Sequence, residues 1–133
     1  MRPQSGETVH LIGSTVSSEA MSAVLHSFAV EAGLGPKRHA VVVLDGAGWH
    51  MAKDLAVPDC IHLVFLPAYS PELQPAERLW PIINEGVANR TFGVLDELVV
   101  NLVNRCLYID AERAFVSGLT RFHWWPAEPP CTT

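Results

Sequence analysis

Residues 40–80 read AVVVLDGAGWHMAKDLAVPDCIHLVFLPAYSPELQPAERLW, and this stretch decides the fold. It contains two apolar runs, Val41–Leu44 and Ile61–Leu66, which end at Asp45 and at Pro67. Runs of this length that are rich in β-branched residues and bounded by Gly or Pro are typical of strands buried on both faces. The stretch therefore predicts two strands of an α/β fold, each followed by a turn.

A strand and a helix are expected before the first of these runs. A turn at residues 3–8 is followed by Val9–Ile12, which reads as a short edge strand. From Ser17 to Ala32 the apolar residues recur at helical spacing, with a serine cap at the start and Gly33 after the end. The order strand, helix, strand suits a right-handed crossover in a mixed or parallel sheet. Because the turn lies so close to Met1, a hairpin partner of the first strand would have to precede this sequence.

Helical signals recur in the rest of the chain, weakly over Met51–Leu55, then from Pro75 to about Asn89, and from about Leu95 to Ala111. Proline is favoured in the first turn of a helix, as Pro75 would be. Pro81 falls inside the expected helix, where its ring should bend the axis. The aromatic pair Trp124–Trp125 could stack on nucleic-acid bases, but packing against the protein's own body is the simpler expectation.

The composition limits the class of protein. A chain of 133 residues, 49% of them hydrophobic, is expected to form one domain with a real core. The net charge of −5 argues against a stand-alone nucleic-acid binder. No apolar run approaches the ~18 residues that a membrane span needs. The widely spaced Cys60, Cys106 and Cys131 read as reduced thiols of a cytoplasmic protein.

Two carboxylates are the candidate site residues. Asp45 follows a strand at its carboxyl end, where α/β folds usually place their sites, and Glu77 lies close to an expected helix start. Hard cations such as Mg²⁺ take oxygen ligands, often one or two carboxylates plus substrate phosphate. The structural alternative is that Asp45 caps the next segment and Glu77 completes a helix N-terminus, and residue types alone favour it. His50 either helps to position a phosphate or a water molecule, or is an ordinary loop histidine.

The segments Leu44–His50 and Leu66–Trp80 resemble the catalytic core of bacterial insertion-sequence transposases of the mariner-related superfamily, which carry a DDE endonuclease domain. The family pattern is L-D-x-A-x-x-H after one strand and L-P-x-Y-S-P-x-L-N-P-x-E-x-x-W after the next. The matching residues are Leu44, Asp45, Ala47 and His50 in the first part, and Leu66, Pro67, Tyr69, Ser70, Pro71, Leu73, Pro75, Glu77 and Trp80 in the second. Gln74 stands where the family usually has asparagine, which is the better helix cap.

The resemblance implies a ribonuclease H-like mixed sheet flanked by helices. It also implies a D-D-E triad of Mg²⁺ or Mn²⁺ ligands, in which Asp45 is the second acid and Glu77 the third, with His50 as a neighbour of the site. Such enzymes cleave DNA at transposon ends and rejoin it through the freed 3′-hydroxyl group. The expected partners are therefore DNA and further copies of the chain, with no membrane.

The resemblance fails at the first acid of the triad. No aspartate precedes Asp45, and the acids before it are Glu7, Glu19 and Glu31, in a turn and on a helix. The family's helix-turn-helix DNA reader is missing as well. We therefore expect residues 1–126 to be a partial, N-terminally truncated catalytic domain without its first strand, and residues 127–133 to be a flexible tail.

This departure decides what the chain is expected to do alone. With two of three ligands it should be inactive or nearly so. The alternatives are a decayed, non-catalytic remnant, a dominant-negative partner of full-length transposase, or a different nuclease with the same fold.

Overall fold

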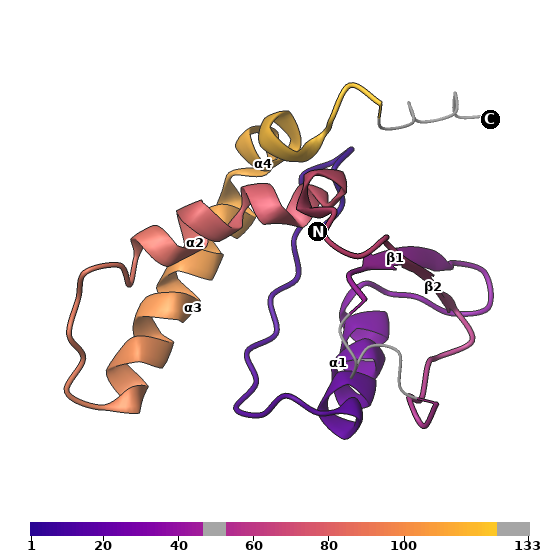
Figure 1. The fold of residues 1–133 in the computed structure, drawn as a ribbon, viewed down its shortest axis with the longest axis horizontal. Coiled ribbons are helices and arrows are strands. Elements are labelled where there is room, and N and C mark those ends of the chain that lie inside the picture. Colours follow the sequence, from indigo (N-terminus) through magenta and orange to yellow (C-terminus); the bar gives the residue numbers. More distant parts are fainter. Residues whose placement is uncertain (47–52, 125–133) are drawn as a thin grey trace. The chain divides into compact units, whose positions relative to one another are not determined.

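The computed structural model describes residues 1–46 and 53–124, which form helices and a small parallel sheet. The elements in chain order are α1 (Ser18–Glu31), β1 (Ala40–Leu44), β2 (Ile61–Phe65), the short 3₁₀ helices η1 (Pro71–Leu73) and η2 (Pro75–Arg78), α2 (Trp80–Glu85), α3 (Leu95–Ala111) and α4 (Arg113–Thr120) (Figure 1). They divide into two compact units, Val9–Gln74 and Met1–Thr8 with Pro75–Thr133.

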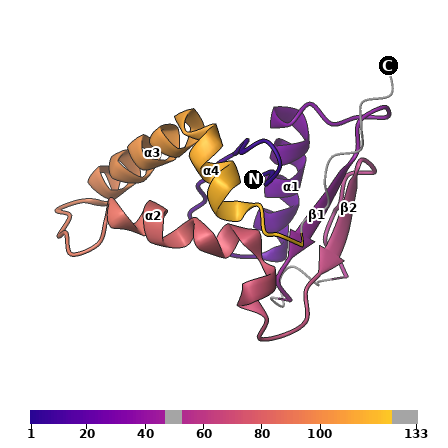
Figure 2. The same ribbon diagram turned by 90° about the horizontal axis from the view of Figure 1, so that it is seen from above.

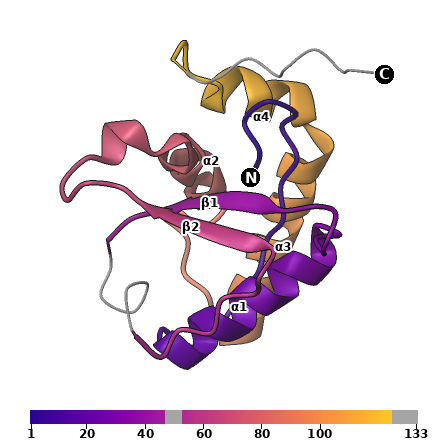
Figure 3. The same cartoon turned by 90° about the vertical axis from the view of Figure 1, so that its right-hand side faces the viewer.

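In the unit Val9–Gln74, β1 and β2 pair in parallel and α1 packs against them. The register runs from Ala40 opposite Ile61 to Leu44 opposite Phe65. The two strands lie side by side and point the same way (Figure 2). α1 runs across one face of this pair (Figure 3). The core residues are Met21, Leu25, Ala29 and Ile61, against which Val24, Phe28, Leu34, Val42, Leu44, Leu55, Cys60 and Leu63 pack.

The ends of α1 lie where the sequence predicts them. The Ser17 hydroxyl group accepts a hydrogen bond from the Ala20 amide at 3.0 Å, which satisfies one free N–H of the first turn. At the other end Gly33 adopts a φ of 64°, a left-handed conformation that costs glycine little. The Leu34 amide then donates to the carbonyl of Ala29 at 2.8 Å. The predicted helix is confirmed.

The strands are not buried on both faces, and this expectation was wrong. Val42, Leu44, Ile61 and Leu63 pack toward α1. The alternate residues Val41 and Val64 are 67% and 47% exposed. Since successive side chains of a strand point to opposite faces, a helix on one side covers only every second residue. The apolar runs predicted the two strands correctly, but they wrongly predicted that both faces of the strands are buried.

The second unit has its own small core. Leu79, Ile109 and Val116 are buried, with Met1, Ile82, Ile83 and Leu119 packed against them. A side chain also ties α3 to α2, because Arg105 Nε donates to the carbonyl of Ile82 at 2.7 Å. The Arg105 guanidinium group also pairs with Glu85 at 2.5 Å.

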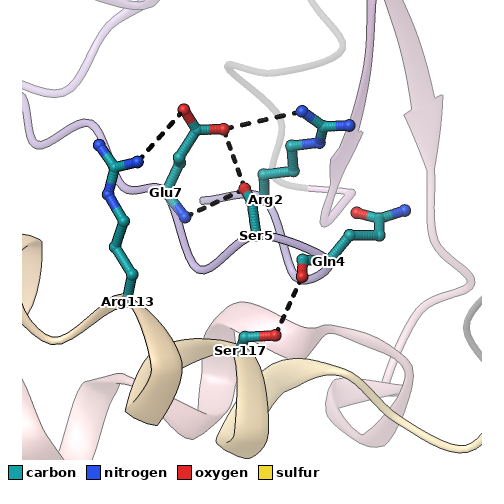
Figure 4. A network of polar contacts seen from close by, with 6 residues as sticks. All are labelled: Arg2, Gln4, Ser5, Glu7, Arg113 and Ser117. Carbon is teal, nitrogen blue, oxygen red and sulfur yellow. Dashed lines mark hydrogen bonds and ion pairs between the residues drawn. The ribbon is translucent and has the colours of Figure 1, made fainter. Parts of the chain in front are cut away.

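The first eight residues form a turn that packs on α4. An antiparallel bridge joins Arg2 to Glu7, so the predicted turn at residues 3–8 is confirmed. Figure 4 shows the Glu7 carboxylate between Arg2 and Arg113, at 3.7 and 3.8 Å. It also accepts a hydrogen bond from Ser5 Oγ at 2.9 Å. Ser117 Oγ donates to the carbonyl of Gln4 at 3.1 Å.

No strand follows this turn, so the predicted edge strand Val9–Ile12 was wrong. In the described residues the sheet consists of β1 and β2, and neither this sheet nor an isolated bridge includes Val9–Ile12. A strand forms only by pairing. The short hairpin closes on itself between Arg2 and Glu7 instead.

The helical segments expected between residues 51 and 89 differ from the prediction. Pro81 lies in the first turn of α2, where its missing N–H costs nothing, so it starts a helix rather than bending one. α2 ends at Glu85, before the expected Asn89. Of the expected helix Met51–Leu55, residues 51 and 52 lie outside the described part, and Lys53–Asp54 form a turn.

The helix α3 has the predicted bounds, Leu95–Ala111, but α4 was missed. Its sequence RAFVSGLT contains a glycine, which weakens the helical signal. Val116 and Thr120 are nevertheless fully buried. The Thr120 hydroxyl group donates to the carbonyl of Val116 at 2.7 Å, which satisfies a buried polar group inside the helix.

The aromatic segment after α4 is only partly packed. Trp124 is 46% exposed and meets the ring of Phe122 at 5.5 Å between centroids. Trp125 and the expected tail 127–133 lie outside the described residues. Cys60 and Cys106 are free thiols, as predicted, while Cys131 lies outside the described part. Within the described ranges, the helices are too short or too polar to cross a membrane.

Candidate site at the end of the parallel strands

Asp45 follows β1 directly and lies exposed at the carboxyl end of the strand pair. The pairing continues one residue beyond the register, because the Leu66 amide donates to the carbonyl of Leu44 at 2.9 Å. In a parallel pair the carboxyl ends of both strands meet at the same edge. Asp45 therefore shares this edge with the turn that follows β2.

The turn after β2 is fastened to β1 by Gln74. Its side-chain Nε2 donates to the carbonyl of Val43 at 3.4 Å. Its backbone N–H also closes η1 by donating to the carbonyl of Pro71 at 3.0 Å. From the sequence, Gln74 was predicted only to be a poorer helix cap than the asparagine usual in the family. A long side-chain amide can reach across to a strand carbonyl, and that reach depends on the tertiary structure.

Tyr69 projects from the same turn into solvent. It is fully exposed and adopts a φ of 58°, an uncommon conformation for a residue with a side chain. Ser70 Oγ donates to the carbonyl of Ala68 at 3.3 Å, and the Leu73 amide donates to the carbonyl of Ser70 at 3.1 Å. These local hydrogen bonds hold the turn in shape around the strained residue.

Glu77 belongs to the other unit, where it is exposed in η2. It was expected near the start of an α-helix, but η2 is a four-residue 3₁₀ helix and α2 begins only at Trp80. Pro75 and Leu79, on either side of it, are buried. These two anchors hold the short element in place and leave the carboxylate in water.

The remaining site prediction, His50, lies outside the described residues. Among the residues that the structure does describe, no three His, Cys, Asp or Glu side chains are grouped so that they could hold a metal ion. Asp45 and Glu77 fall in different units, and each is an exposed oxygen donor in its own unit. Their roles as ligands remain predictions.

A curated relative and a family model match this chain. The chain is 37% identical over 100 residues to "Uncharacterized protein y4pE/y4sA" of Sinorhizobium fredii (strain NBRC 101917 / NGR234). That alignment covers 74% of this chain and 73% of the relative. No solved structure matches. Residues 1–99, which include both Asp45 and Glu77, match the model of the DDE superfamily endonucleases. The chain therefore belongs to the DDE superfamily endonuclease family.

Proposed function

We propose that residues 1–126 are a partial catalytic domain of a DDE transposase with a ribonuclease H-like fold. The complete enzyme cleaves DNA at transposon ends and rejoins it by strand transfer. Membership of the DDE superfamily endonucleases, with both motifs inside the matched residues, carries this proposal.

Asp45 and Glu77 are the proposed metal ligands and catalytic acids, with His50 as their neighbour. The donor chemistry fits, because both are exposed carboxylates and Mg²⁺ or Mn²⁺ takes hard oxygen ligands together with substrate phosphate. Bound ions of this kind activate the attacking hydroxyl group and stabilise the leaving oxygen. Asp45 also lies at the strand edge where α/β folds bind their ligands.

The chain on its own is proposed to be inactive or nearly so. The family uses three acids, and no aspartate precedes Asp45 in this sequence. Asp45 and Glu77 alone would hold such a cation only weakly. A non-catalytic remnant, or a dominant-negative partner that mixes with full-length transposase, is the alternative function that this missing acid favours.

Mn²⁺ titration of the purified chain by calorimetry tests the ligand assignment. Asp45→Asn and Glu77→Gln are each expected to weaken Mn²⁺ binding. The matched controls are Asp59→Asn in the first unit and Glu112→Gln in the second, since both change one exposed acid outside the motifs. Equal Mn²⁺ affinity of all four variants and the parent chain would remove Asp45 and Glu77 as ligands.

A nicking assay on supercoiled plasmid with Mg²⁺ or Mn²⁺ tests the inactivity. Little or no nicking by the isolated chain is expected. Robust nicking that disappears in Asp45→Ala would show instead that the chain is a working nuclease. Cleavage of an RNA–DNA hybrid but not of duplex DNA would point to a different nuclease with the same fold.

Self-association belongs to the same proposal, because an unpaired strand edge is a template for another chain. Sedimentation at several protein concentrations is expected to show a concentration-dependent oligomer. A monomer at every concentration would contradict the proposed homo-oligomer.

A further inference from the structure

Two histidines meet on the sheet face opposite α1. His39 immediately precedes β1 and His62 is the second residue of β2. Nδ1 of His39 lies 2.9 Å from Nε2 of His62, and the ring planes are 17° apart. Both side chains are exposed. Neither residue belongs to the family motifs, and the proposed nuclease activity does not use them.

The hydrogen bond between the rings requires one of the two facing nitrogens to be unprotonated. A neutral imidazole can carry its proton on either ring nitrogen. Both rings can therefore move their protons to the far side and turn lone pairs toward one cation. The two facing nitrogens are already neighbours, so neither ring has to come from another part of the fold to bind the ion.

The spacing of the two nitrogens matches that of two ligands on one ion. At metal–nitrogen bonds of about 2.0–2.1 Å, two nitrogens at a right angle lie roughly 2.9 Å apart, and at a tetrahedral angle roughly 3.3 Å apart. The observed 2.9 Å is a hydrogen-bond length that is also compatible with the right angle. The ring centroids are 5.2 Å apart, so the two nitrogens lie almost on the line between them, and both rings must turn to direct their lone pairs at one ion. Square-planar and tetragonal sites with nitrogen ligands are typical of Cu²⁺ and Ni²⁺, and imidazole suits both ions.

We propose that His39 and His62 form a two-imidazole site for a divalent transition-metal ion, of the class of Cu²⁺ and Ni²⁺, that clamps β1 to β2 at their amino ends. Water fills the other coordination positions, because both rings face solvent. By the general order of affinities, Cu²⁺ binds more tightly than Ni²⁺.

This site is separate from the carboxylate edge. His39 precedes the amino end of β1, and Asp45 follows its carboxyl end six residues later. At about 3.3 Å per strand residue these positions are roughly 20 Å apart, so one ion cannot touch both. The nearby cation Arg38 reaches toward the end of α1, with Nη1 3.9 Å from where a Cβ on Gly33 would be. Ligand chemistry separates the sites as well, since Mg²⁺ prefers oxygen.

Calorimetric titration of the full chain with Ni²⁺ in a non-chelating buffer tests the proposal. Losing even a hydrogen-bond partner of a metal ligand costs about 10–100-fold in affinity, so losing a ligand should cost at least that much. His39→Ala and His62→Ala are each expected to lower Ni²⁺ affinity about tenfold or more. The double variant should be no worse than either single one, because chelation needs both rings.

His26→Ala is the matched control, since His26 is an exposed histidine on α1 in the same unit. His26→Ala should bind Ni²⁺ like the parent chain. The double variant Asp45→Asn/Glu77→Gln should also keep the Ni²⁺ affinity of the parent chain. The result for Ni²⁺ therefore does not depend on whether the nuclease proposal is right. Ni²⁺ should raise the Tm of the parent chain but not of His62→Ala. Unchanged Ni²⁺ affinity in His39→Ala and His62→Ala, or equal losses in His26→Ala, would overturn the proposal.

Discussion

Gly6 lies directly against the backbone of Arg113, so a Cβ atom on Gly6 would overlap the carbonyl group of Arg113. Gly6 also has a φ of 73°, in the left-handed region. The two residues are more than a hundred positions apart in the sequence. Their contact fixes the turn at residues 2–7 on the start of α4, together with the Glu7–Arg113 ion pair at 3.8 Å.

Gly6→Ala should therefore destabilise the unit that contains α4. The left-handed conformation alone costs an ordinary residue about 1–2 kcal/mol, and relief of the overlap adds to it. Urea unfolding should show a loss of at least that size. Gly118→Ala is the matched control, because nothing lies within 4 Å of a Cβ there. That change removes a glycine from a helix and should raise stability by about 0.5–1 kcal/mol.

The core of the same unit depends on one face of α3. Ile109 is 1% exposed, whereas Leu107 on the same helix is 60% exposed. Ile109→Ala should lower the free energy of unfolding by about 2–5 kcal/mol, because it leaves a cavity. Leu107→Ala should change it by about 0.5 kcal/mol or less. Equal losses in the two variants would mean that this face of α3 is not the buried one.

The start of α1 depends on a single side chain. Ser17→Ala removes the hydroxyl group that accepts from the Ala20 amide and should cost about 1 kcal/mol. Ser18→Ala is the control, since it changes a serine one residue further on. Thermal unfolding followed by circular dichroism should separate the two variants. A smaller loss of stability in Ser17→Ala than in Ser18→Ala would mean that Ser18 is the helix cap.

Burial raises the pKa of the Cys106 thiol above 9.0, and the negative charge of Asp110 makes a smaller contribution in the same direction. The folded state therefore holds this proton more tightly than the unfolded state. The resulting stability is complete below pH 9.0 and is lost as the pH rises through the folded pKa.

Alkylation rates measure this shift directly. With Cys60 and Cys131 replaced by serine, the labelling of Cys106 by iodoacetamide should titrate at higher pH in the folded chain than in urea. Asp110→Asn should bring the folded pKa part of the way down, because the larger contribution of burial remains. A folded midpoint at or below the urea value would contradict the raised pKa.

Local signals fixed much of the secondary structure. A serine before an apolar periodic stretch and a glycine after it set α1 within a residue. The apolar spacing of Leu95, Leu98, Leu102 and Cys106 predicted α3, and the two β-branched runs predicted β1 and β2. Each of these signals acts over one or two turns of chain, so it can be read without knowing the fold.

The sequence by itself determined the family motifs, the place of Asp45 directly after a strand and the ends of two helices. Tertiary structure alone decided that Val9–Ile12 forms no strand, that α1 covers one face of the sheet and that a fourth helix buries Val116. The same holds for Gln74 on Val43, Gly6 on Arg113 and His39 on His62. These contacts join residues 23 or more positions apart, and their partners are set by how the elements pack rather than by neighbouring residues.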